Sequence, residues 1–410
     1  YADLHIHSKY SRATSRDMTI PVIAQWARLK GIGLAATGDF THPLWFEHLR
    51  ETLAPSKGGL YLHEDIFFML SAEVSCIYSQ KDKNYRIHHI LYAPSMEEAE
   101  EISAFLSHYG KMMSDGRPII SLDSKTLVKK LRQISPQAFL VPAHIWTPWF
   151  SLFGSNSGFN KIEECFGDAL EYIYALETGL SSDPSMNRLC SKLDSFLLLS
   201  NSDAHSPSNL GRESNIFELN EEDWSFASIR KIISDKNLEK FRGTVEFFPE
   251  EGKYHYDGHR NCKVSLHPKE TRKKHGKCPV CGKALTIGVL NRVYKLSDRK
   301  EGETCPSPSS PSMSLIPLAE ILSEIRGTEK NSKKVKDEYM KMVYALKNEY
   351  HILIEASEKE LCSYDEQTGL AILQMRRGEV EKIPGYDGLF GKLSIRQENS
   401  ARAPRQSLLF

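Results

Sequence analysis

The 410-residue chain lacks long hydrophobic runs, a dense set of cysteines and any net charge. No apolar stretch approaches the roughly 20 residues that cross a bilayer as a helix, so we expect no membrane partner. Eight cysteines, mostly scattered, do not indicate a disulfide framework and favour a reducing, cytoplasmic location. The chain is longer than one hydrophobic core requires, which predicts two or three domains.

The zero net charge conceals a basic segment. Residues 253–300 contain thirteen Lys or Arg against three Asp or Glu, whereas the whole chain contains 53 of each class. Such a segment is typical of a surface that binds a polyanion, although a solvated charged face is the alternative.

Apolar runs alternate with amphipathic stretches over residues 1–245. The runs predict about seven strands, at 2–6, 33–37, 66–72, 86–92, 138–142, 172–176 and 196–199. The amphipathic stretches predict helices at 20–30, 43–53, 96–108, 124–134 and 223–234. Buried parallel strands separated by helices favour an α/β architecture such as a barrel.

Three further regions follow this first domain. Residues 250–300 hold the basic segment and closely spaced cysteines, and the Pro/Ser-rich stretch 301–314 is expected to be a linker without regular structure. Helical patterns at 316–325, 335–350 and 358–361, with a strand-like run at 352–354, predict a small, mostly helical domain over 315–410.

Histidines and carboxylates recur where the predicted strands end. His5 and His7 lie two residues apart on the first strand, so both project to one face. The same side-chain types accompany the later strands, at Asp39, Glu73, His88, His89, His144, Asp203 and His205. Because strand ends of an α/β barrel converge on one mouth, we expect these residues to meet there. Imidazoles and carboxylates without thiolates suit Zn, Mn or Fe in a catalytic centre.

These motifs resemble the polymerase-and-histidinol-phosphatase (PHP) family. The matching stretches, in order, are Asp3-Leu4-His5-Ile6-His7-Ser8, Thr37-Gly38-Asp39, Glu73, His89-Ile90-Leu91, Pro142-Ala143-His144 and Ser202-Asp203-Ala204-His205. The resemblance covers about the first 215 residues and implies a distorted seven-stranded (β/α) barrel with two or three divalent ions (Zn, Mn or Mg). The implied metal ligands are His5, His7, Asp39, Glu73, His89, His144, Asp203 and His205.

Two positions depart from that family's pattern. Asp39 stands where many members have His, and Ala13 stands where some have a further His, which puts a third ion in doubt. On the fourth strand we take His89 rather than His88 as the ligand, because it precedes an Ile-Leu-Tyr run as the family ligand does.

A two-ion centre, with ions about 3.5–4 Å apart, suits displacement at phosphorus. The resemblance makes Glu73 the candidate for a carboxylate that bridges two ions. It also places His5, His7, Asp203 and His205 in the catalytic set. Arg212, just beyond the last ligands, is a candidate to hold a phosphate, with a surface salt bridge as the alternative.

A second ligand pattern lies in the basic segment. His259-Arg260-Asn261-Cys262 and Cys278-Pro279-Val280-Cys281-Gly282 form two pairs of the spacing that structural zinc sites use. We therefore expect Zn on His259, Cys262, Cys278 and Cys281, with His255 or His267 as alternatives to His259. Arg272, Lys273, Lys274 and Lys277 lie between the pairs and are candidates for contact with nucleic acid.

The succession of barrel, zinc ribbon and helical tail resembles the endonuclease Q family. Thr147-Pro148-Trp149, Gly179-Leu180-Ser181-Ser182-Asp183 and Leu210-Gly211-Arg212-Glu213 extend the match over nearly the whole chain. The resemblance implies a DNA endonuclease that nicks 5′ of a deaminated base (uracil, hypoxanthine or xanthine) or an abasic site, associated with the nucleoid and with repair or replication factors. Trp146 and Trp149 are candidates to wedge DNA or to stack on a base, with packing at the barrel rim as the alternative.

Two other functions stay open at this point. A small-molecule phosphomonoesterase would use the same centre but would leave the basic ribbon unexplained. A non-catalytic scaffold that binds nucleic acid would be consistent with the departures at Asp39 and Ala13.

Overall fold

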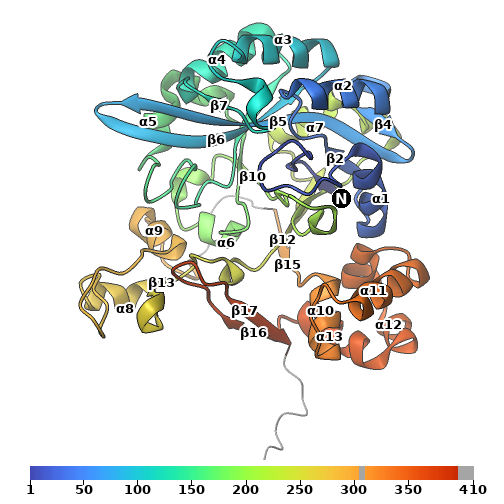
Figure 1. Ribbon diagram of the computed structural model, residues 1–410, viewed down its shortest axis with the longest axis vertical. Coiled ribbons are helices and arrows are strands. Elements are labelled where there is room, and N and C mark those ends of the chain that lie inside the picture. The colour runs from blue at the N-terminus through green and yellow to red at the C-terminus, as the bar shows by residue number, and fades with distance from the viewer. Residues whose placement is uncertain (304–309, 396–410) are drawn as a thin grey trace, which may run out of the picture. The chain divides into compact units, whose positions relative to one another are not determined.

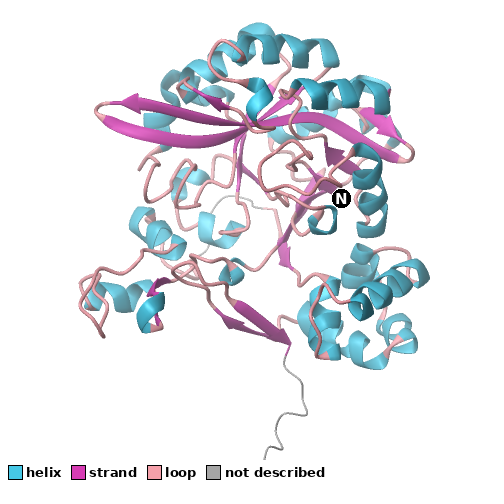
Figure 2. Cartoon of the chain, in the orientation of Figure 1, coloured by secondary structure: helices cyan, strands magenta, loops and turns pink. Residues whose placement is uncertain are grey.

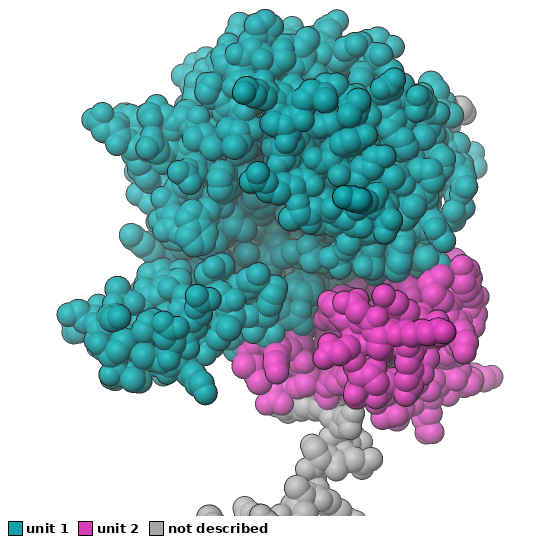
Figure 3. Space-filling model, in the orientation of Figure 1, with its two compact units in different colours: residues 1–314, 384–391 teal, residues 315–383, 392–410 magenta. Residues whose placement is uncertain are grey.

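The computed structural model describes residues 1–303 and 310–395, which form two compact units (Figure 3). The first comprises Tyr1–Ser314 and Pro384–Gly391, and the second Leu315–Ile383 with the residues from Lys392 onward. The expected linker 301–314 lies partly outside the described residues, and its last part forms strand β15 instead of irregular chain. The boundaries expected near 245 and 300 stay predictions. Within the described ranges, no helix has the length and apolar content to cross a membrane.

The first unit is built on a mixed sheet (Figure 1). Its pairing order is β15-β12-β11-β1-β2-β5-β4-β3, while β6 joins β5 to β8 and β7 pairs with β5. These strands are β1 (Ala2–Asp3), β2 (Leu34–Ala36), β3 (Ala54–Pro55), β4 (Tyr61–His63), β5 (Ile66–Gln80), β6 (Lys83–Ala93), β7 (Ile119–Ile120), β8 (Phe139–Pro142), β11 (Ser214–Phe217), β12 (Phe241–Glu246) and β15 (Ser312–Ser314).

The long hairpin of β5 and β6 departs from the expected parallel arrangement. The two strands pair antiparallel from Leu70 to Gln80, and a two-residue turn joins them. Lys81 and Asp82 in this turn both have positive φ, 49° and 60°, which is the backbone of the hairpin turn that matches strand twist. The turn reverses the direction of the chain, so β6 is antiparallel to both β5 and β8.

A closed seven-stranded barrel is not formed by continuous pairing of the described strands. β9 (Ala175–Glu177) and β10 (Leu197–Leu199) form a separate parallel pair. The backbone of this pair meets the neighbouring segments only at isolated points among the described residues: Ile145 N donates to Glu177 O at 3.0 Å, and Ile6 forms an isolated bridge with Ala204. The α/β class is therefore confirmed, whereas the expected barrel is only partly closed.

Eight strands nevertheless share one hydrophobic core. Each of them contributes a buried side chain: Leu4 from the β1 segment, Leu34, Met69, Ile90, Val141, Ala175, Leu197 and Phe241. Phe226, Ile229 and Ile233 of α7 pack into the same core. Burial of such side chains, each contributing about 1.5–3 kcal/mol, fixes the strand ends that carry the polar residues.

Helices cover this sheet, and α3 and α4 lie along the side of β5, β6 and β7 (Figure 1). The expected helices 20–30 and 124–134 have the predicted bounds. In α4, the Asp123 side chain accepts from Thr126 N and so caps the helix start. The helices of this unit are α1 (Ile20–Lys30), α2 (Pro43–Thr52), α3 (Met96–Leu106), α4 (Ser124–Ile134), α5 (Ile162–Phe166), α6 (Pro184–Asn187), α7 (Phe226–Asp235), α8 (Pro268–Lys273) and α9 (Val289–Leu296). Residues 257–266 add the hairpin of β13 (Asp257–His259) and β14 (Val264–Leu266).

The second unit is mostly helical, as expected (Figure 2). The strand-like run at 352–354 is a wrong prediction, because His351–Glu355 is a π-helical segment whose carbonyl groups at Ile352 and Leu353 accept from Arg376. Its elements are α10 (Leu318–Arg326), α11 (Lys333–Ala345), α12 (Glu358–Tyr364), α13 (Glu366–Arg376) and the antiparallel strands β16 (Val380–Ile383) and β17 (Lys392–Ile395).

Candidate metal centre

His5 and His7 follow β1, and both are buried with their rings oriented by carboxylates. His5 Nδ1 lies 3.0 Å from Glu177 Oε1, and His7 Nδ1 lies 3.1 Å from Asp39 Oδ1. A carboxylate accepts, so each Nδ1 donates and each Nε2 presents its lone pair on the other side. Among the described residues, neither Nε2 has a hydrogen-bond partner, although both are buried. This orientation is the one that metal-binding histidines require.

Glu73, in the middle of β5, lies between two groups of possible ligands. Its Oε1 is 2.7 Å from His88 Nδ1 and 3.0 Å from His144 Nε2. Its Oε2 is 3.3 Å from His7 Nε2 and 3.7 Å from His5 Nε2. One carboxylate therefore faces two separate pairs of imidazoles, which is the placement expected of a ligand that bridges two ions.

Asp203 and His205 complete the side of the cluster that faces His7. Asp203 Oδ1 is 3.0 Å from His7 Nε2 and 3.6 Å from His205 Nδ1. The Asp203 side chain is 25% exposed, whereas Glu73 and His7 are fully buried. The cluster is thus open to solvent and to a substrate on this side.

Backbone strain accompanies three of these residues. Asp39, His144 and Asp203 have positive φ, 49°, 30° and 48°. Such conformations are costly for residues other than glycine and persist where the surrounding structure imposes them, often at functional sites. Gly179 makes the His144 position possible, because a Cβ built at Gly179 would lie 2.4 Å from His144 Cβ.

The choice between the two adjacent histidines of β6 is corrected by the structure. Successive residues of a strand point to opposite faces. His88 faces Glu73, whereas His89 faces away and places its Nε2 2.8 Å from Ser124 Oγ. Burial lowers the pKa of His89 to about 3, which keeps this imidazole neutral.

Asp39, an expected metal ligand, does not point into the cluster of ligand atoms. Besides its contact with His7, its Oδ2 accepts from Ser8 N, Ser8 Oγ and Ser11 Oγ at 2.6–2.8 Å. Gly116 closes the remaining space, since a Cβ on Gly116 would lie 2.3 Å from Asp39 Oδ2. Asp39 therefore belongs to no group of converging ligand atoms among the described residues. We correct its role to a hydrogen-bond partner that orients His7.

Two arginines lie near the centre. Arg117, which no sequence motif indicated, places its Nη1 3.1 Å from Glu73 Oε2. Arg212, the expected phosphate ligand, donates from Nε to Ser202 O at 2.9 Å. Burial tends to raise the pKa of Glu73, but His88 and Arg117 outweigh this effect and hold that pKa well below its usual range. Burial likewise opposes ionisation of Asp203, yet His7 and His5 lower its pKa. Both carboxylates are ionised in the pH range where metal ions bind.

Glu177 is a further residue that the sequence did not indicate. Its Oε2 accepts from His144 N at 2.7 Å, and its Oε1 accepts from Asn201 Nδ2 at 2.8 Å as well as contacting His5. It is fully buried at the end of β9. One carboxylate thus fixes residues from both sides of the cluster.

The two tryptophans beside His144 have different environments. Trp146 is buried, and its Nε1 donates to Asn187 Oδ1 at 2.7 Å, which fits the alternative of packing at the rim. Trp149 is 44% exposed and lies edge-on to Tyr254, with ring centroids 5.8 Å apart. Only the second tryptophan of the pair is available to a ligand.

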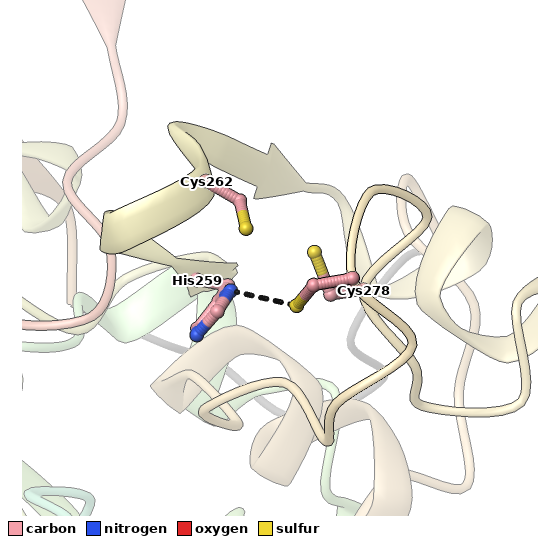
Figure 4. A group of neighbouring side chains, drawn as sticks. His259, Cys262 and Cys278 are labelled. Atoms are coloured by element: carbon pink, nitrogen blue, oxygen red, sulfur yellow. Dashed lines mark hydrogen bonds between the residues drawn. The ribbon is translucent and has the colours of Figure 1, made fainter.

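The second ligand group converges as the sequence spacing predicts. One ligand atom from each of His259, Cys262, Cys278 and Cys281 lies within 4.8 Å of the others, and Figure 4 shows the three labelled side chains pointing toward one another. The alternatives are placed elsewhere, because His255 is buried outside this group and His267 accepts from Lys269 N at the start of α8. Burial opposes thiolate formation at Cys278, but the backbone N–H groups of Cys281 and Val280 lower its pKa to about 6.

The basic residues between the two pairs of ligands lie on the surface. Arg272 and Lys273 end α8, and Lys274 and Lys277 follow it. All four are exposed.

Known proteins resemble this chain over most of its length. The crystal structure of the lesion-specific endonuclease PfuEndoQ from Pyrococcus furiosus is 32% identical, with a TM-score of 0.86 over 97% of this chain and 95% of that one. A structure of Endonuclease Q with a 27-mer duplex substrate that has an abasic lesion at the active site is also 32% identical. Its TM-score is 0.85, over 100% of this chain and 99% of that one.

A family model and a curated relative match parts of the chain. The model of the MJ0043 C-terminal domain matches residues 317–379. The uncharacterized protein MJ0043 of Methanocaldococcus jannaschii is 34% identical over 259 residues, which are 62% of this chain. The aligned part is 32% of that relative, so the chain spans about a third of its length.

A mixed α/β fold with two histidine groups around a shared, ionised carboxylate defines a metal-dependent phosphoesterase. Full-length similarity at 32% identity then specifies the group: the chain belongs to the endonuclease Q family. It is an endonuclease, a hydrolase of phosphodiester bonds.

Proposed function

We propose that this endonuclease acts on DNA and nicks the phosphodiester on the 5′ side of a deaminated base (uracil, hypoxanthine or xanthine) or an abasic site. The position of Glu73 between two groups of ligands is the observation that carries the proposal of a phosphodiester hydrolase with more than one ion. The damaged substrate is supported by the family, one member of which is solved with an abasic duplex.

The donor atoms fit divalent metal ions. His5 Nε2, His7 Nε2 and Asp203 Oδ1 are buried atoms that lack hydrogen-bond partners among the described residues, and they converge beside Glu73. His88 and His144 hold the other side. When bound, the ions lower the pKa of water to yield hydroxide near neutral pH and offset negative charge at phosphorus. Nitrogen and carboxylate donors suit Zn or Mn, with Mg as a further candidate.

Two ions rather than three is our proposal for this centre. His7, Asp203 and His205 form a third group of converging ligand atoms, which shares His7 with the group of His5, His7 and Glu73. Because these two groups share His7, we propose that they hold one ion, and that Glu73, His88 and His144 hold the other. Asp39, whose carboxylate accepts from Ser8 and Ser11, adds no further ligand.

The chain's own residues would position the phosphodiester. Arg117 reaches Glu73 from the solvent side and is partly exposed, so its guanidinium can bind a phosphate oxygen at the open side of the cluster. Arg212 is the second candidate for this task. His205 and Asp203, both partly exposed, border the same opening. Glu177 and Asp39 act as positioning residues, because each holds one imidazole by its Nδ1.

The Cys/His group would bind a Zn ion with a structural role. Three sulfur atoms and one imidazole make a closed set of four ligands, with the Cys278–Cys281 turn supplying backbone N–H groups to sulfur. The exposed residues Arg272, Lys273, Lys274 and Lys277 would bind the DNA backbone in a salt-dependent manner.

Cleavage of end-labelled duplexes tests this function. We expect a single nick 5′ of one deoxyuridine, one deoxyinosine or one abasic site with added Mn or Mg, and no nick in an undamaged control. Glu73→Gln should abolish nicking, by roughly 10³-fold or more, because it removes the charge shared by both ligand groups. Exposed Glu47→Gln is the matched control. Turnover of a simple phosphomonoester without any nick would replace the proposal with the phosphomonoesterase alternative.

A further inference from the structure

A turn from late in the chain belongs to the first unit. Residues 384–391 connect β16 and β17 and pack with residues 250–260. The latter segment contains His259, a member of the Cys/His group. Gly385 N donates to Glu250 O at 2.8 Å, Tyr256 N donates to Gly385 O at 2.9 Å, and Gly388 N donates to Lys253 O at 3.0 Å. These backbone hydrogen bonds hold the turn in one place.

Asp387 fixes the turn further. Its Oδ2 accepts from Arg260 N at 2.7 Å, and its Oδ1 accepts from Thr286 Oγ1 at 2.6 Å. The Tyr386 ring covers Gly258, where any Cβ would collide with it. The segment is therefore tied by hydrogen bonds, with its polar groups turned toward residues 250–286.

The same turn directs two large apolar side chains toward solvent. Leu389 is 43% exposed and Phe390 is 70% exposed. Lys253 Nζ lies 4.4 Å from the centre of the Phe390 ring, and a Cβ built on Gly388 would lie 3.6 Å from Arg260 Nη1. An exposed Leu-Phe pair with a cation over the Phe ring, on a turn fixed by hydrogen bonds, contributes little to the core and is available for contact with a ligand.

The turn is also connected to the metal centre by adjacent residues. Thr147 Oγ1 lies 3.2 Å from His144 Nδ1 and donates to Trp149 O at 3.0 Å. Trp149 is next to Tyr254, and a Cβ on Gly388 would lie 3.7 Å from Tyr254 Oη. A series of contacts therefore leads from His144 through Thr147, Trp149 and Tyr254 to Gly388, which directly precedes the exposed pair.

We infer that Leu389 and Phe390 form a wedge that enters duplex DNA where the damaged nucleotide leaves the stack. The inference rests on the proposed DNA endonuclease function and specifies how the duplex is held. An extruded nucleotide leaves a gap with two apolar base faces, and Leu or Phe inserted between base steps is a known way to fill such a gap. Lys253, over the Phe390 ring, and Arg260, beside Gly388, would meet phosphates near the gap.

Binding measurements in the Glu73→Gln background, in which cleavage is prevented, test the wedge. Phe390→Ala should weaken binding to a duplex with one abasic site roughly tenfold, as expected for loss of one base–aromatic contact. Binding to an undamaged duplex and to the abasic single strand should change less than about twofold, because neither offers a gap in a stack. Phe390→Trp should restore the affinity. Tyr344→Ala, which removes an exposed ring of the second unit, is the control.

The outcomes separate this inference from the function on which it rests. The wedge would be overturned if Phe390→Ala weakened binding to all three DNAs equally or to none of them. It would also be overturned if Phe390→Trp weakened binding as much as Phe390→Ala. Binding of the abasic duplex no tighter than the undamaged one before substitution would overturn it as well. If the unsubstituted enzyme fails to nick damaged DNA but the selective loss with Phe390→Ala is observed, the proposed function fails and the wedge stands.

Discussion

The two groups of metal-binding side chains differ in how the chain assembles them. The His/carboxylate cluster takes its members from segments between His5 and His205, each held by a strand that contributes to a shared core. The Cys/His group takes its members from residues 259–281, where β13, β14 and α8 are short. The first group is therefore positioned by the fold, whereas the second has little core of its own to position it.

The chemistry of the two groups follows the same division. The cluster combines imidazole and carboxylate side chains around Glu73 and has an open side at Asp203. The Cys/His group closes four ligands around one position, with sulfur predominating. Open N/O sites on a rigid frame are typical of catalysis, and closed sulfur-rich sites in small segments are typical of structural zinc.

The largest effect that would separate the two regions is expected from Cys278→Ser. Without a complete set of four ligands, residues 250–300 should lose the proposed Zn ion, whose binding would supply folding free energy on the order of several kcal/mol. We expect the loss of one Zn per chain by elemental analysis, together with a lower melting temperature. The content of ions in the His/carboxylate cluster should be unchanged, because that cluster depends on a separate core.

Cys362→Ser is the matched control, since Cys362 is a partly exposed cysteine of the second unit. If Cys278→Ser kept all of its bound Zn and an unchanged melting curve, residues 250–300 would not depend on a metal for their stability. Loss of ions from both regions together would contradict their independence.

The sequence indicated the parts of the cluster that depend on local spacing. His5 with His7 and Asp203 with His205 are two residues apart, and Glu73 follows a clear apolar run. The spacing of His259, Cys262, Cys278 and Cys281 was sufficient for the second group, whose members are close in sequence. Helices 20–30 and 124–134 were also predictable, because their apolar faces repeat with the helical period.

The remaining parts depend on tertiary structure that no local pattern indicates. The choice of His89 failed because the face of β6 is set by its pairing with β5, through a turn without Asn-Gly or another common hairpin signal. Arg117 and Glu177 reach the cluster from a loop and from the end of β9, at sequence distances of 44 and 172 residues from their partners. The hydrogen bonds of Asp39 with Ser8 and Ser11 likewise appear only in the folded chain.

A smaller effect, confined to the first region, is expected from Glu177→Gln. The substitution keeps the shape of the side chain but removes the charge that holds His5 Nδ1, so metal affinity should fall about 10- to 100-fold. We would measure this by metal titration and by nicking at rising Mn concentration. Excess Mn should rescue the activity if Glu177 positions a ligand, whereas a folding defect would not be rescued. Exposed Glu171→Gln is the control.

The smallest effect is expected on the surface of the second region. The Lys273→Ala, Lys274→Ala double variant removes two exposed charges without touching a ligand of the Cys/His group. Affinity for DNA should fall by a similar factor for damaged and undamaged duplexes, and the slope of log K against log salt should decrease by about 1 to 2. Nicking at saturating DNA should be unchanged, because these lysines contribute backbone binding and not chemistry. An unaltered slope would place the DNA on another surface and would leave the Cys/His region with a structural role alone.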